Sequence, residues 1–114
     1  MKVKIAELTG QALDWAVAQC EGRTDKYWMN DSITGTYSPS TYWMLGGPII
    51  ERESIHVEPD SDRKVWMGSI AMKTFKYEDN SPLVAAMRSF VASKLGNDVE
   101  VPDDLCVEIG NKYE

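Results

Sequence analysis

The chain has 114 residues, of which 43% are hydrophobic and 26% charged, which suits one globular domain over residues 1–114 and is too little for two. It carries 18 acidic and 12 basic side chains, a formal net charge of −6, so direct binding to nucleic acid phosphates is disfavoured. The longest largely apolar run, residues 42–50, is far shorter than the roughly 20 residues that span a bilayer. We therefore expect neither nucleic acid nor membrane as a partner.

The N-terminal residues do not have the pattern of a secretion signal. They turn polar and acidic by Glu7, before an apolar core develops. Cys20 and Cys106 are the only cysteines. We expect a cytoplasmic protein with reduced thiols.

The first predicted helix covers about residues 10–21. Thr9 suits the N-cap, Leu8 is placed to pack over the first turn, and Gly22 ends the helix. Its buried side is expected to consist of Leu13, Ala16, Val17 and Cys20.

The middle of the chain has conflicting signals. Ser38–Thr41 is typical of a helix start, but Gly46-Gly47-Pro48 interrupts the helical pattern that follows. We expect a short helical turn after Thr41 and a helix that restarts with Pro48 at its first position and runs to Glu53. An extended strand through residues 49–50 is the alternative.

A β-hairpin is predicted next. Residues 54–58 alternate, with Ile55 and Val57 inward, residues 59–63 have turn composition, and residues 64–72 form a longer strand. Phe75 and Tyr77 continue the alternation toward the last helix.

The clearest element is a helix from Pro82 to Leu95. Ser81 can cap its first turn, Pro82 needs no N–H bond there, and Gly96 suits the C-terminal cap. The apolar stripe predicted for the core is Leu83, Val84, Met87, Phe90, Val91 and Leu95, with Arg88, Ser89 and Ser93 on the other side.

The C-terminal segment, residues 96–114, is acidic and expected to be partly ordered. It holds one basic residue, Lys112, against six acidic ones. Alternation at residues 99–101 and 107–109 would allow short strands, and we expect order at least to Leu105. The chain is thus predicted to be an α+β domain, with about three helices on both sides of a small antiparallel sheet.

Several of these segments resemble a known family. They are Leu13-Asp14-Trp15-Ala16-Val17-Ala18, Gly46-Gly47-Pro48-Ile49-Ile50-Glu51-Arg52-Glu53, Pro82-Leu83-Val84-Ala85-Ala86-Met87-Arg88, Ser93-Lys94-Leu95-Gly96 and Val99-Glu100-Val101-Pro102. Together they resemble the NinX-like family of small proteins of tailed bacteriophages and prophages, over about residues 2–105. The resemblance implies an accessory phage protein in a bacterial host cell, without an assigned activity or catalytic residues. The sequence departs from the family at Thr41-Tyr42-Trp43, where an Asp before the Trp is more typical, and residues 58–80 carry no shared motif.

No set of residues forms a coherent catalytic or metal site. His56 and Glu58 match half of a zinc deaminase signature, but the Cys-x-x-Cys half is missing. Ser61 and Lys64 have the spacing of a nucleophile and its base but lie in a predicted turn. Cys20, on an apolar stripe, should be an inert thiol of raised pKa, and Cys106 could react only if exposed. We therefore expect a protein that is not an enzyme, with no cofactor and no metal.

Two aromatic doublets in loop-like sequence are the candidate binding residues. These are Tyr27-Trp28 and Tyr42-Trp43, which either cover the core or anchor a partner. An exposed doublet beside Arg52 or Arg88 would suit a planar or anionic ligand.

Three functions follow from these observations. The first is an accessory protein that binds a host protein through its aromatic residues. The second is a protein that binds a nucleotide-like small molecule at a pocket or a dimer junction, with Trp43 or Trp28 stacking and Arg52 or Arg88 pairing with phosphate. The third is an acidic DNA mimic that uses the charge of residues 98–108.

Overall fold

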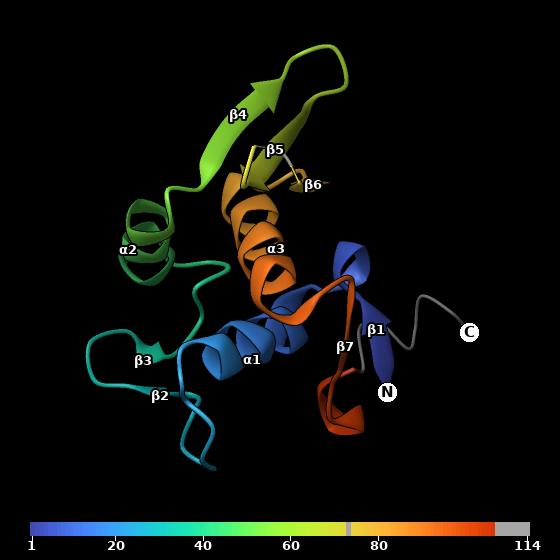
Figure 1. Ribbon diagram of the computed structural model, residues 1–114. Helices are drawn as coiled ribbons and strands as arrows, with labels where there is room; N and C mark the ends of the chain where they lie inside the picture. The colour runs from blue at the N-terminus through green and yellow to red at the C-terminus, as the bar shows by residue number, and fades with distance from the viewer. Residues whose placement is uncertain (73, 107–114) are drawn as a thin grey trace.

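Helix α3 (Pro82–Leu95) is the central element of the computed structural model, which describes residues 1–72 and 74–106 (Figure 1). Both predicted ends are confirmed: the Ser81 side chain accepts a hydrogen bond from the Val84 N–H at 3.3 Å, and Gly96 has φ +92°. The predicted core residues Leu83, Val84, Met87, Phe90 and Val91 are all buried. Leu95, by contrast, is 42% exposed, because it lies in the last turn, beyond the elements that cover the helix.

Arg88 and Ser89, which were predicted on the side of the helix opposite the apolar stripe, are buried as well. Every residue from Leu83 to Ala92 is buried, because the sheet, both other helices and the N-terminal 3₁₀ turn η1 (Ile5–Glu7) all contact α3. A helix enclosed in this way must satisfy its polar side chains internally. Ser89 does so by donating its hydroxyl proton to the Ala85 carbonyl at 3.1 Å. Ser93 is half-buried.

The predicted hairpin and its extension form one antiparallel sheet of β4 (His56–Asp60), β5 (Val65–Ile70) and β6 (Phe75–Asp79), in that order. α3 packs on one face of this sheet. Contact is close at Gly68, where a Cβ atom would lie 2.5 Å from the Ala85 carbonyl oxygen. The predicted turn is displaced to residues 61–64, because Pro59 and Asp60 still pair with β5, and β5 ends before the predicted Met72.

Helix α1 (Gly10–Cys20) begins where it was predicted to begin. Leu13, Ala16 and Val17 are buried as expected, whereas Cys20 in the last turn is only half-buried. Thr9 occupies the N-cap position without a side-chain hydrogen bond to the helix. Asp14, which no apolar pattern could place inside, is 6% exposed.

Helix α2 (Trp43–Glu53) is continuous, so the predicted interruption at Gly46-Gly47-Pro48 is wrong. Pro48 is exposed, and its missing N–H deprives only Met44, at the exposed start of the helix, of a bond that water can replace. Gly46 is buried against Pro39 and Leu83, in a space that admits no side chain. Tertiary packing therefore outweighs the local helix-breaking signal.

The layer arrangement also differs from the prediction. α1 and α2 pack against α3 and not on the far face of the sheet (Figure 1). The sheet thus has helix α3 on one face, and the fold is a compact α+β domain of three helices with small antiparallel sheets.

Two further strand pairs complete the fold. β1 (Lys2–Lys4) pairs with β7 (Asp98–Glu100), joining segments at opposite ends of the described chain, and β2 (Asn30–Asp31) pairs with β3 (Gly35–Thr36). A 3₁₀ turn, η2 (Asp103–Leu105), follows β7. The predicted strand at residues 107–109 lies outside the described residues. No helix among the described residues is long and apolar enough to cross a membrane.

Candidate functional site

Exposed large apolar side chains are concentrated between α1 and α2. We call residues 22–44 the aromatic segment. It includes five of the eight such side chains in the described chain: Tyr27 (60% exposed), Ile33 (76%), Tyr42 (46%), Trp43 (56%) and Met44 (61%). Exposed large apolar side chains are candidates for contact with a partner, and this segment of the chain holds most of them.

The two predicted doublets differ in exposure. Tyr42 and Trp43 are both exposed, and Met44 extends them into a run of three exposed residues at the start of α2. In the other doublet Tyr27 is exposed, whereas Trp28 is half-buried. Ile33 was not predicted as a site residue, since a single Ile in a polar loop carries no pattern.

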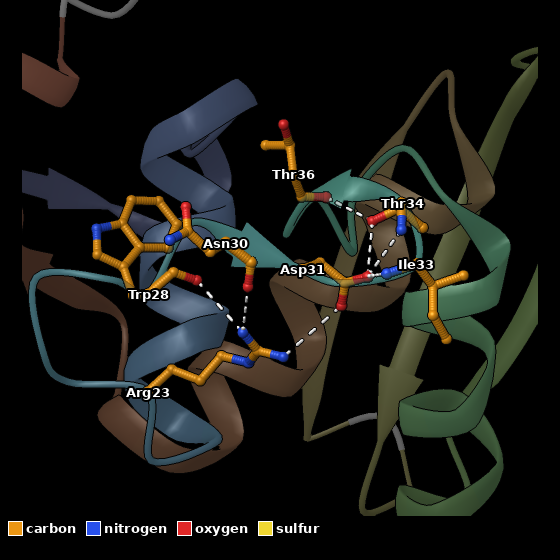
Figure 2. Close-up of polar contacts among 7 residues, drawn as sticks. All are labelled: Arg23, Trp28, Asn30, Asp31, Ile33, Thr34 and Thr36. Atoms are coloured by element: carbon orange, nitrogen blue, oxygen red, sulfur yellow. Dashed lines mark hydrogen bonds and ion pairs between the residues drawn. The ribbon is translucent and has the colours of Figure 1, made fainter.

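Arg23 organises the first half of the aromatic segment (Figure 2). Its Nη1 donates to the carbonyl oxygens of Asn30 at 3.1 Å and Trp28 at 3.5 Å, and its Nη2 lies 3.8 Å from Asp31 Oδ2. Its guanidinium also stacks 3.9 Å from the ring centroid of Tyr37, which is buried. One side chain thereby ties β2, and Tyr37 directly after β3, to the segment that follows α1.

The tip of the β2–β3 hairpin is held by Asp31. Its Oδ1 accepts the backbone N–H groups of Ile33 at 2.9 Å and Thr34 at 2.8 Å (Figure 2). These bonds hold the pKa of Asp31 below its ordinary value. Turns of this kind are typical of Asp, so Asp31 could have been found from the sequence. The exposed Ile33 side chain is therefore displayed from a defined backbone.

Asp14 anchors the second half of the aromatic segment. Its carboxylate accepts the Ser40 N–H at 2.9 Å, and Ser40 is only 2% exposed. Burial raises the pKa of Asp14 to about 6, against the opposing effect of these hydrogen bonds to Ser40. Tyr42 to Met44 follow directly, so they too project from a fixed backbone.

The predicted role of Arg88 in ligand binding required a side chain at the surface, but Arg88 is buried. Its Nε donates to the Leu8 carbonyl at 2.9 Å and its Nη1 to the Glu78 carbonyl at 2.7 Å, and Nη1 also lies 3.2 Å from Asp79 Oδ1. The residue is 8% exposed. Arg88 thus links three parts of the fold and is not accessible to a ligand.

Arg52 is exposed but already paired. Its Nη1 and Nη2 donate to the two carboxylate oxygens of Glu21 at 3.0 and 2.7 Å, and its Nε donates to Glu53 at 2.8 Å. These bonds occupy the fork that a phosphate would take. Arg52 also lies nine residues from Trp43, about 13 Å along the helix axis. The structure does not bring either arginine beside the exposed Tyr42-Trp43 doublet.

The remaining candidates have ordinary surroundings. His56 Nε2 lies 3.2 Å from Glu58 Oε2 on β4, and no group of three or more His, Cys, Asp or Glu within residues 1–72 and 74–106 could hold a metal ion. Burial raises the pKa of Cys20 to about 11, as predicted for an unreactive thiol. Cys106 is buried, and its Sγ donates to the Pro102 carbonyl at 3.4 Å.

These features define a class of protein: a small α+β domain that displays an ordered aromatic segment to solvent. A family model described as "Bacteriophage P22, NinX" matches residues 4–94, so the chain belongs to this phage family. The family resemblance seen in the sequence is thus confirmed, and the matched range contains the whole aromatic segment. A comparison with curated proteins found no match.

Proposed function

We propose that this phage protein is a non-enzymatic accessory protein that binds a host protein through its aromatic segment. The observation that carries the proposal is the gathering of five exposed large apolar side chains on one segment. Aromatic residues and Met are enriched in the centres of protein interfaces, where a few of them supply most of the binding energy.

The order of the aromatic segment supports the same function. Arg23, Asp31 and Asp14 hold its backbone through hydrogen bonds, so little conformational entropy remains to be lost when a partner binds.

The acidic edge, by which we mean the acidic side chains of β7 and η2, favours a partner with basic residues and does not favour DNA mimicry. Asp98, Glu100 and Asp103 lie there, but Lys2 Nζ is 3.8 Å from Asp98, and the amino group of Met1 is 3.5 Å from Glu100 and 2.8 Å from Asp103. This partial neutralisation leaves too little charge for a row of phosphate-like carboxylates, whereas a modest acidic edge still steers a basic partner.

A pocket for a nucleotide-like ligand has less support. Two depressions were found on the surface of the described residues. One is lined by Ser54, His56, Ser69, Ile70, Ala71 and Met72, and another by Ala6, Arg63, Met67, Lys76, Tyr77 and Glu78. Neither contains a residue of the two doublets or the predicted arginines. The geometry thus favours a protein partner.

The test is affinity capture from host lysate with a tagged chain, followed by reconstitution of the captured host protein with purified components. The variant Trp43→Ala/Met44→Ala should weaken the reconstituted complex at least about tenfold, as loss of central anchors does. Met72→Ala is the matched control, because Met72 is 99% exposed and lies in the β5–β6 turn, outside the aromatic segment.

Circular dichroism of both variants should match the parent chain, since none of the altered side chains is buried. Equal binding by the parent chain and the Trp43→Ala/Met44→Ala variant would overturn the proposal. Self-association that depends on Trp43, with no host protein retained, would replace the host partner by a second copy of this chain.

A further inference from the structure

Helix α2 has one side against the fold and one side toward solvent. Its inner side contacts α3, and α2 lies at the margin of the molecule (Figure 1). Gly46 and Ile49 are buried, and Leu45, Ile50 and Glu53 are half-buried. At 3.6 residues per turn these five fall on one half of the helix. The other half, which we call the outer face of α2, consists of Trp43, Met44, Gly47, Pro48, Glu51 and Arg52.

The outer face is apolar at one end and acidic at the other. Trp43 and Met44 are exposed at the start of α2, and Pro48 is exposed one turn later. Gly47 leaves a gap beside Pro48, since a Cβ atom there would meet nothing within 4 Å. Trp43, Gly47 and Glu51 follow at intervals of four residues, so they form one row of about 12 Å along the helix.

The charge of Glu51 is not neutralised by its neighbours. Arg52 is bonded to Glu21 and Glu53, and Glu53 also lies 3.2 Å from Lys94 Nζ. The exposed Glu51 carboxylate has no hydrogen bond or ion pair within the described part of the chain. It lies in the last turn of α2, where the helix dipole is also negative. Both charges favour a cation at this end of the outer face.

The outer face is better suited to a helix than to an extended segment. An extended segment binds mainly through main-chain hydrogen bonds to an open sheet edge, whereas the backbone groups of a helix bond within the helix. A second helix needs no such bonds and can pack a ridge of side chains into the gap at Gly47.

We propose that the outer face of α2 docks an amphipathic helix of the host partner. Large apolar side chains of that helix contact Trp43 and Met44, and a lysine or arginine about two turns away pairs with Glu51. This inference rests on the proposed function and specifies the kind of partner.

A second copy of this chain does not supply the required cation. The positive charge on each outer face is Arg52, which Glu21 and Glu53 already engage. Two outer faces packed together would leave both Glu51 carboxylates partly desolvated without a counterion, which is unfavourable. A basic helix of another protein is therefore the better occupant.

Two helical peptides that differ in one charge test this proposal. The Lys peptide is Ac-AQLAELLQKLAQAKAQ-NH2, in which the second lysine lies eight residues after a leucine of the apolar stripe, and the Glu peptide has glutamate at that lysine. Both are also made in reverse order, so that either direction of packing is sampled. The Lys peptide should shift the amide NMR signals of Trp43, Gly47 and Glu51 and bind at least about threefold more tightly than the Glu peptide at low salt. Equal affinities, or no shifts at these residues in either order, would overturn the proposal.

Charge reversal makes the assignment specific. Glu51→Lys should bind the Glu peptide more tightly than the Lys peptide, and it should fold, because Glu51 is exposed and a lysine suits the last turn of a helix. Asp62→Lys is the matched control: Asp62 is exposed in the β4–β5 turn, and its substitution changes the net charge equally. A preference that Glu51→Lys leaves unchanged, or that both variants reverse, would contradict the proposed surface.

The proposed function and this inference fail in different ways. A captured host protein that depends on Trp43 and Met44 but binds Glu51→Lys as tightly as the parent chain would overturn the basic helix and leave the proposed function intact. Binding of the Lys peptide as expected, with no host protein retained through Trp43, would leave the docking surface and overturn the proposed function.

Discussion

Two adjacent glycines in α2 differ in the space available for a side chain. A Cβ atom on Gly46 would lie 2.5 Å from the Pro39 carbonyl oxygen and 2.6 Å from Leu83 Cδ1, whereas a Cβ atom on Gly47 would meet nothing within 4 Å. Gly46→Ala should therefore destabilise the fold by about 1–3 kcal/mol through overpacking. Gly47→Ala should stabilise it by about 0.5–1 kcal/mol, because alanine loses less entropy in a helix. Urea unfolding of both variants measures this, and the same sign for both would refute the close packing at Gly46.

The buried carboxyl of Asp14 gives the fold a defined pH dependence. Its pKa is about 6 in the folded protein against an ordinary value of 3.8, so the folded state holds the proton more tightly. The free energy of unfolding contributed by this group therefore falls as pH rises through the interval from about 4 to 6. A shift of about two pKa units corresponds to on the order of 3 kcal/mol.

Asp14→Asn keeps an acceptor for the Ser40 N–H and removes the titration. Relative to the parent chain, it should gain stability between pH 4 and pH 7, measured by thermal unfolding at several pH values. A stability difference that stays constant over this pH range would show that Asp14 does not titrate as argued.

The two arginines of the helices differ in what they connect. Arg88 joins α3 to the carbonyls of Leu8 and Glu78 from inside the fold, while Arg52 joins the ends of α1 and α2 at the surface, through Glu21. Arg88→Gln should cost about 3 kcal/mol or more, because buried partners lose their bonds. Arg52→Gln should lower the free energy of unfolding by less than about 1 kcal/mol, because the Arg52–Glu21 pair is exposed. Even this difference should disappear at high salt, which screens the pair. Unfolding titrations at low and high ionic strength distinguish the two, and comparable costs would contradict this assignment.

Elements with local signals were predictable, and elements fixed by distant contacts were not. Ser81, Pro82 and Gly96 specify the ends of α3 within the sequence itself. The burial of Arg88 depends on a carbonyl 80 residues away, and the β1–β7 pairing joins Val3 to Val99. The continuity of α2 depends on the space that Gly46 leaves for Leu83. Periodicity within one segment contains none of this information.

At the scale of the whole molecule, the candidate site was only half predictable. The sequence identified aromatic doublets because Tyr and Trp in loop-like sequence are informative by type. Whether they face the core or the solvent depends on how Arg23 and Asp14 fold the aromatic segment onto α1, which involves single polar residues without a pattern. The same limitation applies to Arg52 and Arg88, whose partners come from other helices and strands.

The contacts of α3 with the sheet and with both other helices predict that the described chain unfolds as one cooperative unit. The aromatic segment should take part, since the Asp14–Ser40 bond and the Arg23 contacts tie it to α1. Urea transitions followed by far-ultraviolet circular dichroism, which reports the helices, and by tryptophan fluorescence should therefore coincide. Fluorescence of Trp28, within the aromatic segment, is the sensitive probe, isolated as the difference between the parent chain and Trp28→Phe. A Trp28 transition at lower urea than the helix signal would mean that the aromatic segment unfolds separately and that its order does not lower the entropic cost of binding.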